Sequence, residues 1–491
     1  EMVSPKDLAY GLPMWWLQLV MPIGFAILGV KLSAQGAGTG WRHRILALIW
    51  PLAGLGLAAW WDGEALFLWP CLAFLVAALL CGAPIFAVLG GLALAFFWSE
   101  GLPLASIALS QYQMTVNPSL PALPLFTLAG LLFAKTGAVQ RLGVLFLAIF
   151  GNGLIGTLLA ATVLCSFFTA FTGGSGVTIL ALGGLLLPLL RNAGYPEQRG
   201  ISLVTSASAL GVLLAPSVPL IMYAIIARVP INTMFLAGLV PALVMVVCLL
   251  VFGGYLRKHD SAPRTVVPNV DVGRAIWSAK WEILAPVVAI ASLVSGVATP
   301  TESAALTAAY AILTLAFAHR ELTWRSLGEC LSQCAQIIGG VMLILGMALG
   351  LTNYLVDAGI PDLVIDAVQG LTQNKYVFLL ALNVFLFFAG ALMEIYAAIV
   401  VLVPLLLPLA MSYGIDPVHF GIIFLANMEM GFLCPPAGMN IFFASAIFKK
   451  PIRIVAISVM PALFAIFVGT MLISWLPLIA LSLPSYLGSM P

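Results

Sequence analysis

The sequence predicts an all-α polytopic membrane protein, built from two inverted repeats that each contain a re-entrant helical hairpin and a broken transmembrane helix. Hydrophobic residues make up 62% of the 491 positions and charged residues only 8%, and several motifs recur in the same order about 220 positions apart. This composition places most of the chain in lipid. Because a helix needs about 20 apolar residues to cross the hydrocarbon, the chain has room for about a dozen spanning or re-entrant helices.

Charge and cysteine content exclude two classes of site. The formal net charge is +2, and no basic tract suited to phosphate contacts occurs, so we predict no nucleic-acid binding. Cys330 and Cys334 have no histidine nearby to complete a zinc site. We interpret the cysteines as small hydrophobic residues.

The distribution of polar residues divides the chain into four parts. Residues 1–64 contain two apolar runs that predict two helices ahead of the main body. The polar segment 254–280 carries Lys and Arg residues, which the positive-inside rule places in the cytoplasm as a linker. It separates a first half, 65–253, from a second half, 281–491.

The two halves share sequence motifs. The run LLLPLLRNAG at 185–194 recurs as LLLPLAMSYG at 405–414, an offset of 220 positions. Two further pairs have the same offset, namely Gly211 with Gly431 and Pro216 with Pro436. One internal repeat explains all of these matches.

The charges that flank the first helical pair of each half differ in sign. Acidic residues flank this pair in the first half, and basic residues flank its counterpart: Asp62, Glu64 and Glu100 against Lys280, Arg320 and Arg325. The positive-inside rule therefore places the two pairs in opposite orientations. Such inverted repeats are typical of secondary transporters, whose substrate and ion sites lie near the midplane where helices are interrupted.

The segment FTAFTGGSGVT at 168–178 predicts the first hairpin, with its tip near 172–176. Arg141 precedes it and Arg191 follows it, so both ends should be cytoplasmic, and we expect arms too short for a comfortable crossing. Carbonyls freed at such a tip can coordinate a cation. The alternative is a glycine-rich contact that lets helices pack closely.

The matching segment of the second half, GALMEIYAA at 390–398, predicts the second hairpin, with its tip near 392–396. It places Glu394 inside an apolar hairpin. An acid at membrane depth costs several kcal/mol unless it is paired or ligating, so Glu394 is a candidate ion ligand or proton carrier. The alternative is a buried acid capped by a backbone amide or a hydroxyl.

Each hairpin is followed by a helix with prolines at its centre, GVLLAPSVPLIMY at 211–223 and GFLCPPAGMNIFF at 431–443. Proline removes an amide donor and clashes with the preceding turn, so both helices should unwind there. Unwinding exposes carbonyls and amides at the half-helix ends. We therefore predict two symmetry-related cation sites at the tips and breaks. The candidate ion- or substrate-binding residues are Thr172, Gly173, Gly174, Ser175, Ala215, Pro216, Ser217, Glu394, Cys434, Pro435, Pro436, Gly438 and Asn440.

Two other acids have less specific surroundings. Glu302, in ATPTES, follows a break between helices and is expected to cap the next helix, with a substrate role as the alternative. For Glu429 the sequence leaves a capping role and a substrate role open.

Taken together, TGGSG, APSVP, ATPTESAA, GIDPVHFG and CPPAGMN resemble the large membrane subunit of TRAP (tripartite ATP-independent periplasmic) transporters. The resemblance spans about 65–480, and the motifs occur in the family's order. The segment PMWWLQLVMPIGFAILGVKL resembles the last helix of the family's small membrane subunit. We therefore expect a fused small–large polypeptide seen without its first helices.

The resemblance implies an elevator-type ion transporter in the bacterial inner membrane. Its expected partners are the lipid bilayer, a periplasmic substrate-binding protein and a small membrane subunit or its fused helices. Sodium is the expected coupling ion, with no other cofactor, and the sequence contains no Walker-type P-loop. The expected substrate is an organic acid, such as a dicarboxylate, a sialic acid or a sulfonate.

This chain departs from the family's motifs at both hairpin tips. Where the family usually has Ser-Gly-Ser, this chain has Thr172, Gly173 and Gly174, and Ser175 is the nearest replacement for the missing hydroxyl. The family's acid in the second hairpin is commonly aspartate, whereas this chain has the longer Glu394.

Two alternative functions would require different sequence features. A stand-alone sodium- or proton-coupled dicarboxylate symporter of the same superfamily would not need the helices predicted in 1–64. An intramembrane enzyme would need paired acids or a histidine cluster at membrane depth, whereas the four histidines lie near predicted helix ends or in loops. We predict a transporter and not an enzyme.

Overall fold

A computed structural model describes residues 68–80, 83–151, 153–256, 271–294, 297–435 and 438–487, together with residues 7, 8, 12, 13 and 31. The helices predicted in 1–64 lie outside the described residues, as do the linker residues 257–270. Near the start of the chain, β1 (Asp7–Leu8) and β2 (Leu12–Pro13) pair antiparallel. The chain forms two compact units: Glu1–Ala73 with Ala95–Pro103, and Phe74–Leu94 with Leu104–Pro491.

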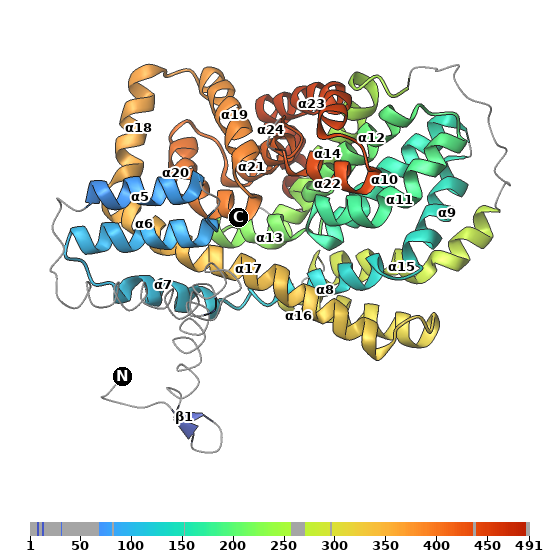
Figure 1. Cartoon of the computed structure of the whole chain (residues 1–491), viewed down its shortest axis with the longest axis horizontal. Helices are drawn as coiled ribbons and strands as arrows, with labels where there is room; N and C mark the ends of the chain where they lie inside the picture. Colours follow the sequence, from blue (N-terminus) through green and yellow to red (C-terminus); the bar gives the residue numbers. More distant parts are fainter. Residues whose placement is uncertain are drawn as a thin grey trace, which may run out of the picture. The chain divides into compact units, whose positions relative to one another are not determined.

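The described helices follow one another along both halves of the chain (Figure 1). Those of the first half are α5 (Leu68–Leu80), α6 (Ile85–Ser99), α7 (Ala105–Thr115), α8 (Ala122–Ala134), α9 (Ala138–Phe150), α10 (Leu154–Thr172), α11 (Ser175–Asn192), α12 (Glu197–Leu210), the 3₁₀ helix η3 (Gly211–Leu213), α13 (Val218–Ala227) and α14 (Ile231–Phe252). Those of the second half are α15 (Val272–Val294), α16 (Pro300–Leu313), the π-helix η4 (Thr314–Ala318), α17 (Trp324–Asp357), α18 (Ile360–Leu371), α19 (Lys375–Leu392), α20 (Ile395–Ser412), α21 (Pro417–Gly431), α22 (Met439–Phe448), α23 (Ile452–Trp475) and α24 (Pro477–Tyr486).

Ten segments among the described residues are long and apolar enough to cross a membrane, or eleven if α8 and α9, which meet at a 75° bend, count as one span. The predicted all-α polytopic membrane fold is confirmed. In each half a helical hairpin precedes a broken helix: α10 and α11 precede α12 and α13, and α19 and α20 precede α21 and α22.

The two broken helices also end alike. Their second parts, α13 and α22, each have 10 residues. Arg228 and Lys449 follow them in the left-handed region, with φ of 55° and 52°. A proline comes two positions later in both cases, Pro230 and Pro451. Since these features are not part of the matched sequence motifs, they support the internal repeat independently.

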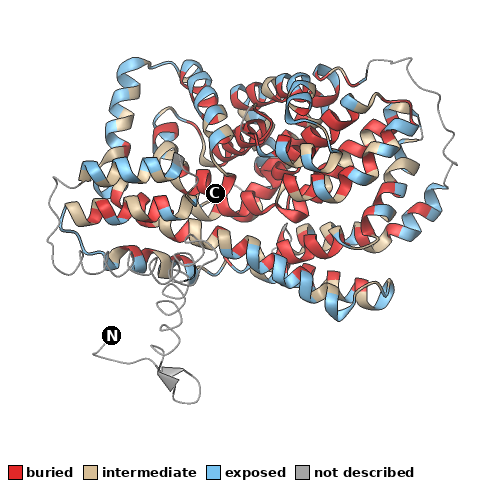
Figure 2. Ribbon diagram, viewed as in Figure 1, coloured by how far each residue is buried: buried red, intermediate tan, exposed pale blue. Residues whose placement is uncertain are grey.

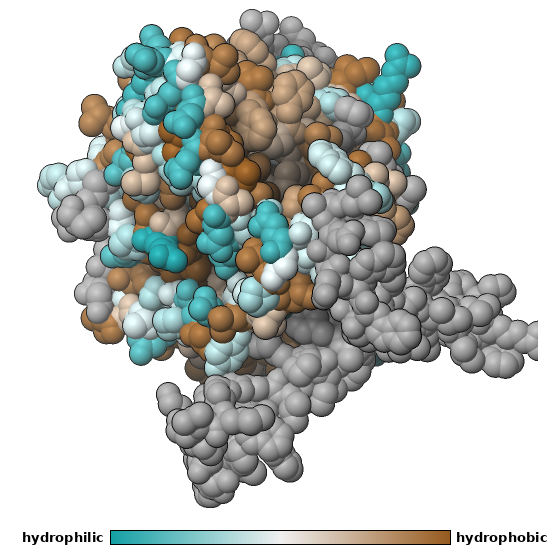
Figure 3. Space-filling model, turned by 90° about the vertical axis from the view of Figure 1, so that its left-hand side faces the viewer, coloured by the Kyte–Doolittle hydropathy of each residue, from teal (hydrophilic) through white to brown (hydrophobic). Residues whose placement is uncertain are grey.

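The first parts of the broken helices, α12 and α21, carry the most deeply buried stretches. All residues from Gly200 to Leu210 and from Val418 to Gly431 are buried, and buried residues appear red in Figure 2. Large apolar side chains are exposed on other helices, among them Leu243, Phe385 and Phe464. Brown hydrophobic side chains are likewise prominent on the face drawn in Figure 3, as expected where helices face lipid.

One glycine in each repeat allows the hairpin to pack closely on the broken helix that follows it. A Cβ at Gly431 would lie 2.3 Å from the carbonyl carbon of Gly390 on α19. A Cβ at Gly211 would lie 2.2 Å from the carbonyl oxygen of Ser166 on α10. Both contacts are with backbone, which cannot move aside as a flexible side chain can. The glycines that match at an offset of 220 therefore have a packing role.

Replacing Gly431 by alanine should lower the free energy of unfolding by about 1 to 3 kcal/mol, because the new methyl group overpacks a backbone contact. Gly339→Ala, on α17, is the matched control, since a Cβ there meets nothing within 4 Å. It should be neutral or slightly stabilising, because alanine favours helix more than glycine. Thermal unfolding of the purified protein measures both, and an equal response of the two variants would contradict the packing role.

Candidate functional site

The first hairpin turns at Gly173 and Gly174. Gly173 ends α10 with φ of 70°, in the left-handed region that glycine adopts without strain, and Gly174 is extended. Helix α11 then begins at Ser175 and packs against α10. A Cβ at Gly173 would lie 2.8 Å from the Val218 side chain at the start of α13. The tip therefore lies beside the break of its own repeat.

The arms of this hairpin are longer than the sequence suggested. Helices α10 and α11 have 19 and 18 residues, and both are long enough to cross a membrane. The expectation that the arms are too short is therefore wrong, because the apolar run continues almost to the glycine turn. Length does not distinguish a re-entrant hairpin from two crossings, so the case for re-entry depends on the flanking basic residues.

Threonine hydroxyls at the first tip bond mainly to one another. The Thr169 hydroxyl donates to Thr178 Oγ1 at 2.7 Å, and the hydroxyls of Thr172 and Thr178 lie 3.2 Å apart. All three side chains are buried. This cluster links the last turn of α10 to the first turn of α11, and so it holds the tip closed.

Ser175 joins the first hairpin to the broken helix of the other repeat. Its hydroxyl donates to Asn440 Oδ1 at 2.7 Å, and the two side chains are 5% and 1% exposed. Asn440 Nδ2 is buried and has no hydrogen-bond partner among the described residues. Ser175 begins α11 and Asn440 lies in the first turn of α22. The positive ends of two helix dipoles thus meet beside an unused amide donor.

The second hairpin reaches the same place through a tyrosine. The Tyr396 hydroxyl donates to the carbonyl oxygen of Gly173 at 2.9 Å, which connects the two tips. Glu394 precedes α20 and caps it, because its Oε2 accepts from the N–H groups of Tyr396 at 3.0 Å and Ala397 at 3.4 Å. The capping alternative considered for Glu394 is therefore what the structure shows in this conformation.

The two breaks differ in detail. In the first, the Ser217 hydroxyl donates to the Val212 carbonyl and accepts from the Leu220 N–H at 3.4 Å, so Ser217 caps α13. Ala215 and Pro216 precede it and are joined by a cis peptide bond.

In the second break, the Gly438 N–H donates to the Cys434 carbonyl at 2.7 Å. The Asn440 N–H donates to the Phe432 carbonyl at 3.2 Å, which brings the start of α22 back against the end of α21. Pro435 follows Cys434, and Pro436 lies outside the described residues.

The structure thus brings Gly173, Ser175 and Asn440 together with Tyr396, which the sequence predictions did not include. Its position two residues after Glu394 marks it as part of the second tip, but the sequence does not indicate what its hydroxyl contacts. No group of three or more His, Cys, Asp or Glu side chains that could hold a metal ion occurs among the described residues. A cation site at the tips would therefore take most of its ligands from backbone carbonyls, hydroxyls and amide oxygens.

The two remaining acids have different roles. Glu302 forms a capping box with Thr299, since each side chain accepts from the other's backbone N–H, at 2.8 and 3.3 Å. The predicted capping role of Glu302 is confirmed. Glu429, for which the sequence left two roles open, is fully buried on α21.

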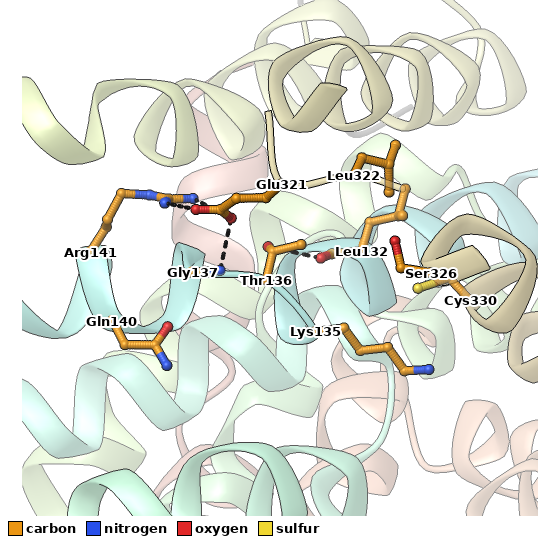
Figure 4. A pocket seen from close by; sticks show the side chains of 10 residues that line it. All are labelled: Leu132, Lys135, Thr136, Gly137, Gln140, Arg141, Glu321, Leu322, Ser326 and Cys330. Atoms are coloured by element: carbon orange, nitrogen blue, oxygen red, sulfur yellow. Dashed lines mark hydrogen bonds and ion pairs between the residues drawn. The ribbon is translucent and has the colours of Figure 1, made fainter. Parts of the chain in front are cut away.

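An ion cluster lies at the bend between α8 and α9, beside a pocket of about 620 Å³ (Figure 4). Arg141 donates from Nε to Glu282 Oε1 at 2.7 Å and from Nη1 to Glu321 Oε1 at 2.6 Å. Glu321 Oε2 also accepts from the Gly137 N–H at 2.9 Å. His319 Nε2 lies 3.1 Å from Glu282 Oε1. The cluster therefore fastens the α8–α9 bend to α15 and to the loop before α17.

Comparison with known proteins supplies the family. The sequence model described as "Tripartite ATP-independent periplasmic transporter, DctM component" matches residues 72–479. The chain belongs to this family. The resemblance seen in the sequence is confirmed, and the family is one of inner-membrane transporter permeases, so the interpretation as an intramembrane enzyme is excluded.

Curated relatives of this permease cover most of its length. The "Isethionate TRAP transporter permease protein DctMQ" of Oleidesulfovibrio alaskensis is 33% identical over 95% of this chain and 74% of its own. The "C4-dicarboxylate TRAP transporter large permease protein DctM" of Rhodobacter capsulatus is 32% identical over 84% of this chain and 98% of its own.

A solved structure has a similar fold. The YdaH transporter of Alcanivorax borkumensis matches with a TM-score of 0.50 and 15% identity, over 72% of this chain and 84% of its own. At that identity the similarity supports the fold alone.

Proposed function

We propose that this permease imports an organic acid, with a carboxylate or sulfonate group, using the sodium gradient and an elevator movement. Three relatives support the substrate class, because their names specify isethionate, C4-dicarboxylates and, for a protein of Vibrio cholerae that is 30% identical, sialic acid. These compounds differ in shape and share an anionic group. Membership in the permease family explains membrane transport. The contact between Ser175 and Asn440 explains why the substrate would be an anion.

The contact between Ser175 and Asn440 is the observation that carries this proposal. The Ser175 hydroxyl donates a hydrogen bond to Asn440 Oδ1. This contact orients the amide and leaves its Nδ2 hydrogens free to donate. A carboxylate or sulfonate oxygen there would be near the starts of α11 and α22, where helix dipoles favour negative charge. We infer that the anionic group of the substrate binds at this point.

The proposed sodium sites lie at the two tips and breaks. The Gly173 carbonyl already accepts from Tyr396 and has a second lone pair. A sodium ion that coordinates such carbonyls would tie a hairpin tip to the adjacent break, and a substrate anion at Asn440 would tie the first tip to the second break. Ion and substrate would then stabilise the same closed arrangement, which is what coupling requires.

We propose two protein partners. A periplasmic binding protein would deliver the substrate, since the family's own description is tripartite and periplasmic. A small membrane subunit would be represented by the helices predicted in 1–64, since the DctMQ relative is matched over 95% of this chain.

Sodium should raise the thermal stability of the purified protein in a saturable way when it replaces potassium at constant ionic strength. A ligand that binds only the native state stabilises it by about 2.7 kcal/mol at 100 times its dissociation constant. Glu394→Gln should weaken this response by removing a negative charge beside the second tip, while Glu329→Gln, an exposed acid on α17, should leave it unchanged. Equal melting temperatures in the two salts would count against sodium coupling.

A further inference from the structure

The carboxyl group of Glu429 is buried without a hydrogen-bond partner in the described part of the chain. The residue is 0% exposed, and neither Oε1 nor Oε2 has a hydrogen-bond partner among the described residues. Buried carboxylates normally have at least one such partner, since an unpaired charge in a medium of low dielectric costs several kcal/mol or more. This acid therefore needs an explanation of its own.

Glu429 lies two residues before Gly431, at the end of α21, which packs against η3 in the break of the first repeat. The backbone N–H of Leu213, in η3, faces the carboxyl group in a geometry short of a hydrogen bond. Leu213 is itself tightly packed, since a Cβ at Gly238 would lie 2.0 Å from its carbonyl oxygen. The carboxyl group is thus enclosed where the two broken helices cross.

No charged side chain among the residues that the structure describes pairs with Glu429. α21 itself carries His419, and Asp416 precedes it. The titratable side chains on the helices that pack against α21 are Glu197, Arg199, Tyr223, Cys248, Lys375, Tyr376, Tyr396, Arg453 and Tyr486. None of these side chains forms a hydrogen bond with the carboxyl group.

The internal repeat shows that the fold does not require an acid here. At the offset of 220 that relates Gly211 to Gly431, the counterpart of Glu429 is Ala209, which is also 0% exposed. A methyl group fills the corresponding position in the first repeat. The second repeat therefore keeps an acid at a place where an apolar side chain fits the architecture, and such intramembrane acids are functional by default.

We propose that Glu429 is a proton-binding site at the crossing of the two broken helices, separate from the hairpin tips, and that it holds a proton in this conformation. A neutral acid fits an enclosed site where no cationic side chain of the described residues pairs with it. A proton suits the site better than a sodium ion, because the facing group is an N–H, whose positive end would repel a metal cation. The proposal does not depend on sodium coupling at the tips.

Infrared spectroscopy of the purified full-length protein tests the proposal directly. At neutral pH the wild type should show the C=O band of a protonated carboxylic acid, shifted in D₂O, and this band should be absent from Glu429→Gln. Glu394→Gln, which alters the acid at the second hairpin tip, should retain the band. The proposal is overturned if Glu429→Gln retains the band in full, if the wild type shows no such band, or if sodium removes it at constant pH.

The pH dependence of thermal stability gives a second readout. A carboxyl group that is protonated in the folded protein, and ionises more readily once unfolded, costs increasing stability as the pH rises. The melting temperature of the wild type should therefore fall from acid to alkaline pH more steeply than that of Glu429→Gln, in which a neutral amide replaces the acid. Glu329→Gln should follow the wild type. Parallel profiles for wild type and Glu429→Gln would overturn the proposal, and if Glu429→Gln does not fold, the infrared titration of the wild type decides.

Discussion

Arg141→Met should lower the free energy of unfolding by about 3 to 5 kcal/mol, the usual cost of removing one partner of a buried ion pair. Glu282 is 1% exposed and accepts from Arg141 at 2.7 Å. Methionine fills much of the same volume but leaves that carboxylate buried without the guanidinium. The loss is measurable as a lower melting temperature in detergent.

Arg325→Met is the matched control for this variant. Arg325 pairs with Glu329 on the surface of α17, where its side chain is 91% exposed, and such exposed pairs contribute about 0 to 1 kcal/mol. The double variant Arg141→Met with Glu282→Gln should recover part of the lost stability, because it removes the uncompensated charge. Similar losses for Arg141→Met and Arg325→Met would contradict a structural role for the cluster.

Acid should weaken the same cluster. The hydrogen bond from Arg141 lowers the pKa of Glu321, which lies in the loop before α17. A group whose pKa is lower in the folded protein stabilises the fold above its unfolded pKa, and this contribution is lost as the pH falls through the folded value. Arg141→Met should therefore lose less stability on acidification than the wild type does.

The parts of the fold that could be predicted from sequence depend on local backbone chemistry. Glycine adopts the left-handed turn at 173 without strain, and prolines stand at both helix breaks, at 216 and 435. Proline alone does not decide a break, because Pro188 lies inside the continuous helix α11. Thr299 and Glu302 form a capping box from residues three apart. Signals of this kind are complete within a few residues of the chain.

What could not be predicted depends on contacts between distant segments. Ser175 and Asn440 are 265 positions apart, and nothing local indicates that the serine orients the amide. Tyr396 was not identified because its hydroxyl reaches a carbonyl of the other hairpin. Glu429 stayed ambiguous for the converse reason, since a sequence does not show which buried acid lacks a partner.

Replacing Asn440 by alanine should lower uptake by about 10 to 100-fold, because a buried anion that loses its donor forfeits about 1 to 3 kcal/mol. The assay is uptake into cells that contain the binding protein, with whichever C4-dicarboxylate, isethionate or sialic acid the wild type imports. Asn440→Asp should reduce uptake at least as much, since it replaces the donor with an acceptor that repels the substrate anion. Unchanged uptake by Asn440→Ala would show that the anion binds elsewhere.

The contribution of Ser175 can be separated from that of Asn440 by a double-mutant cycle. Ser175→Ala removes the hydroxyl that fixes the amide, so it should reduce uptake less than Asn440→Ala does, and the double variant should be no worse than Asn440→Ala alone. Ser458→Ala is the matched control, because that hydroxyl donates only to the Val455 carbonyl of its own helix. If the effects of Ser175→Ala and Asn440→Ala on uptake multiply, the two residues act independently. That result would contradict the proposal that Ser175 orients the Asn440 amide for the anion.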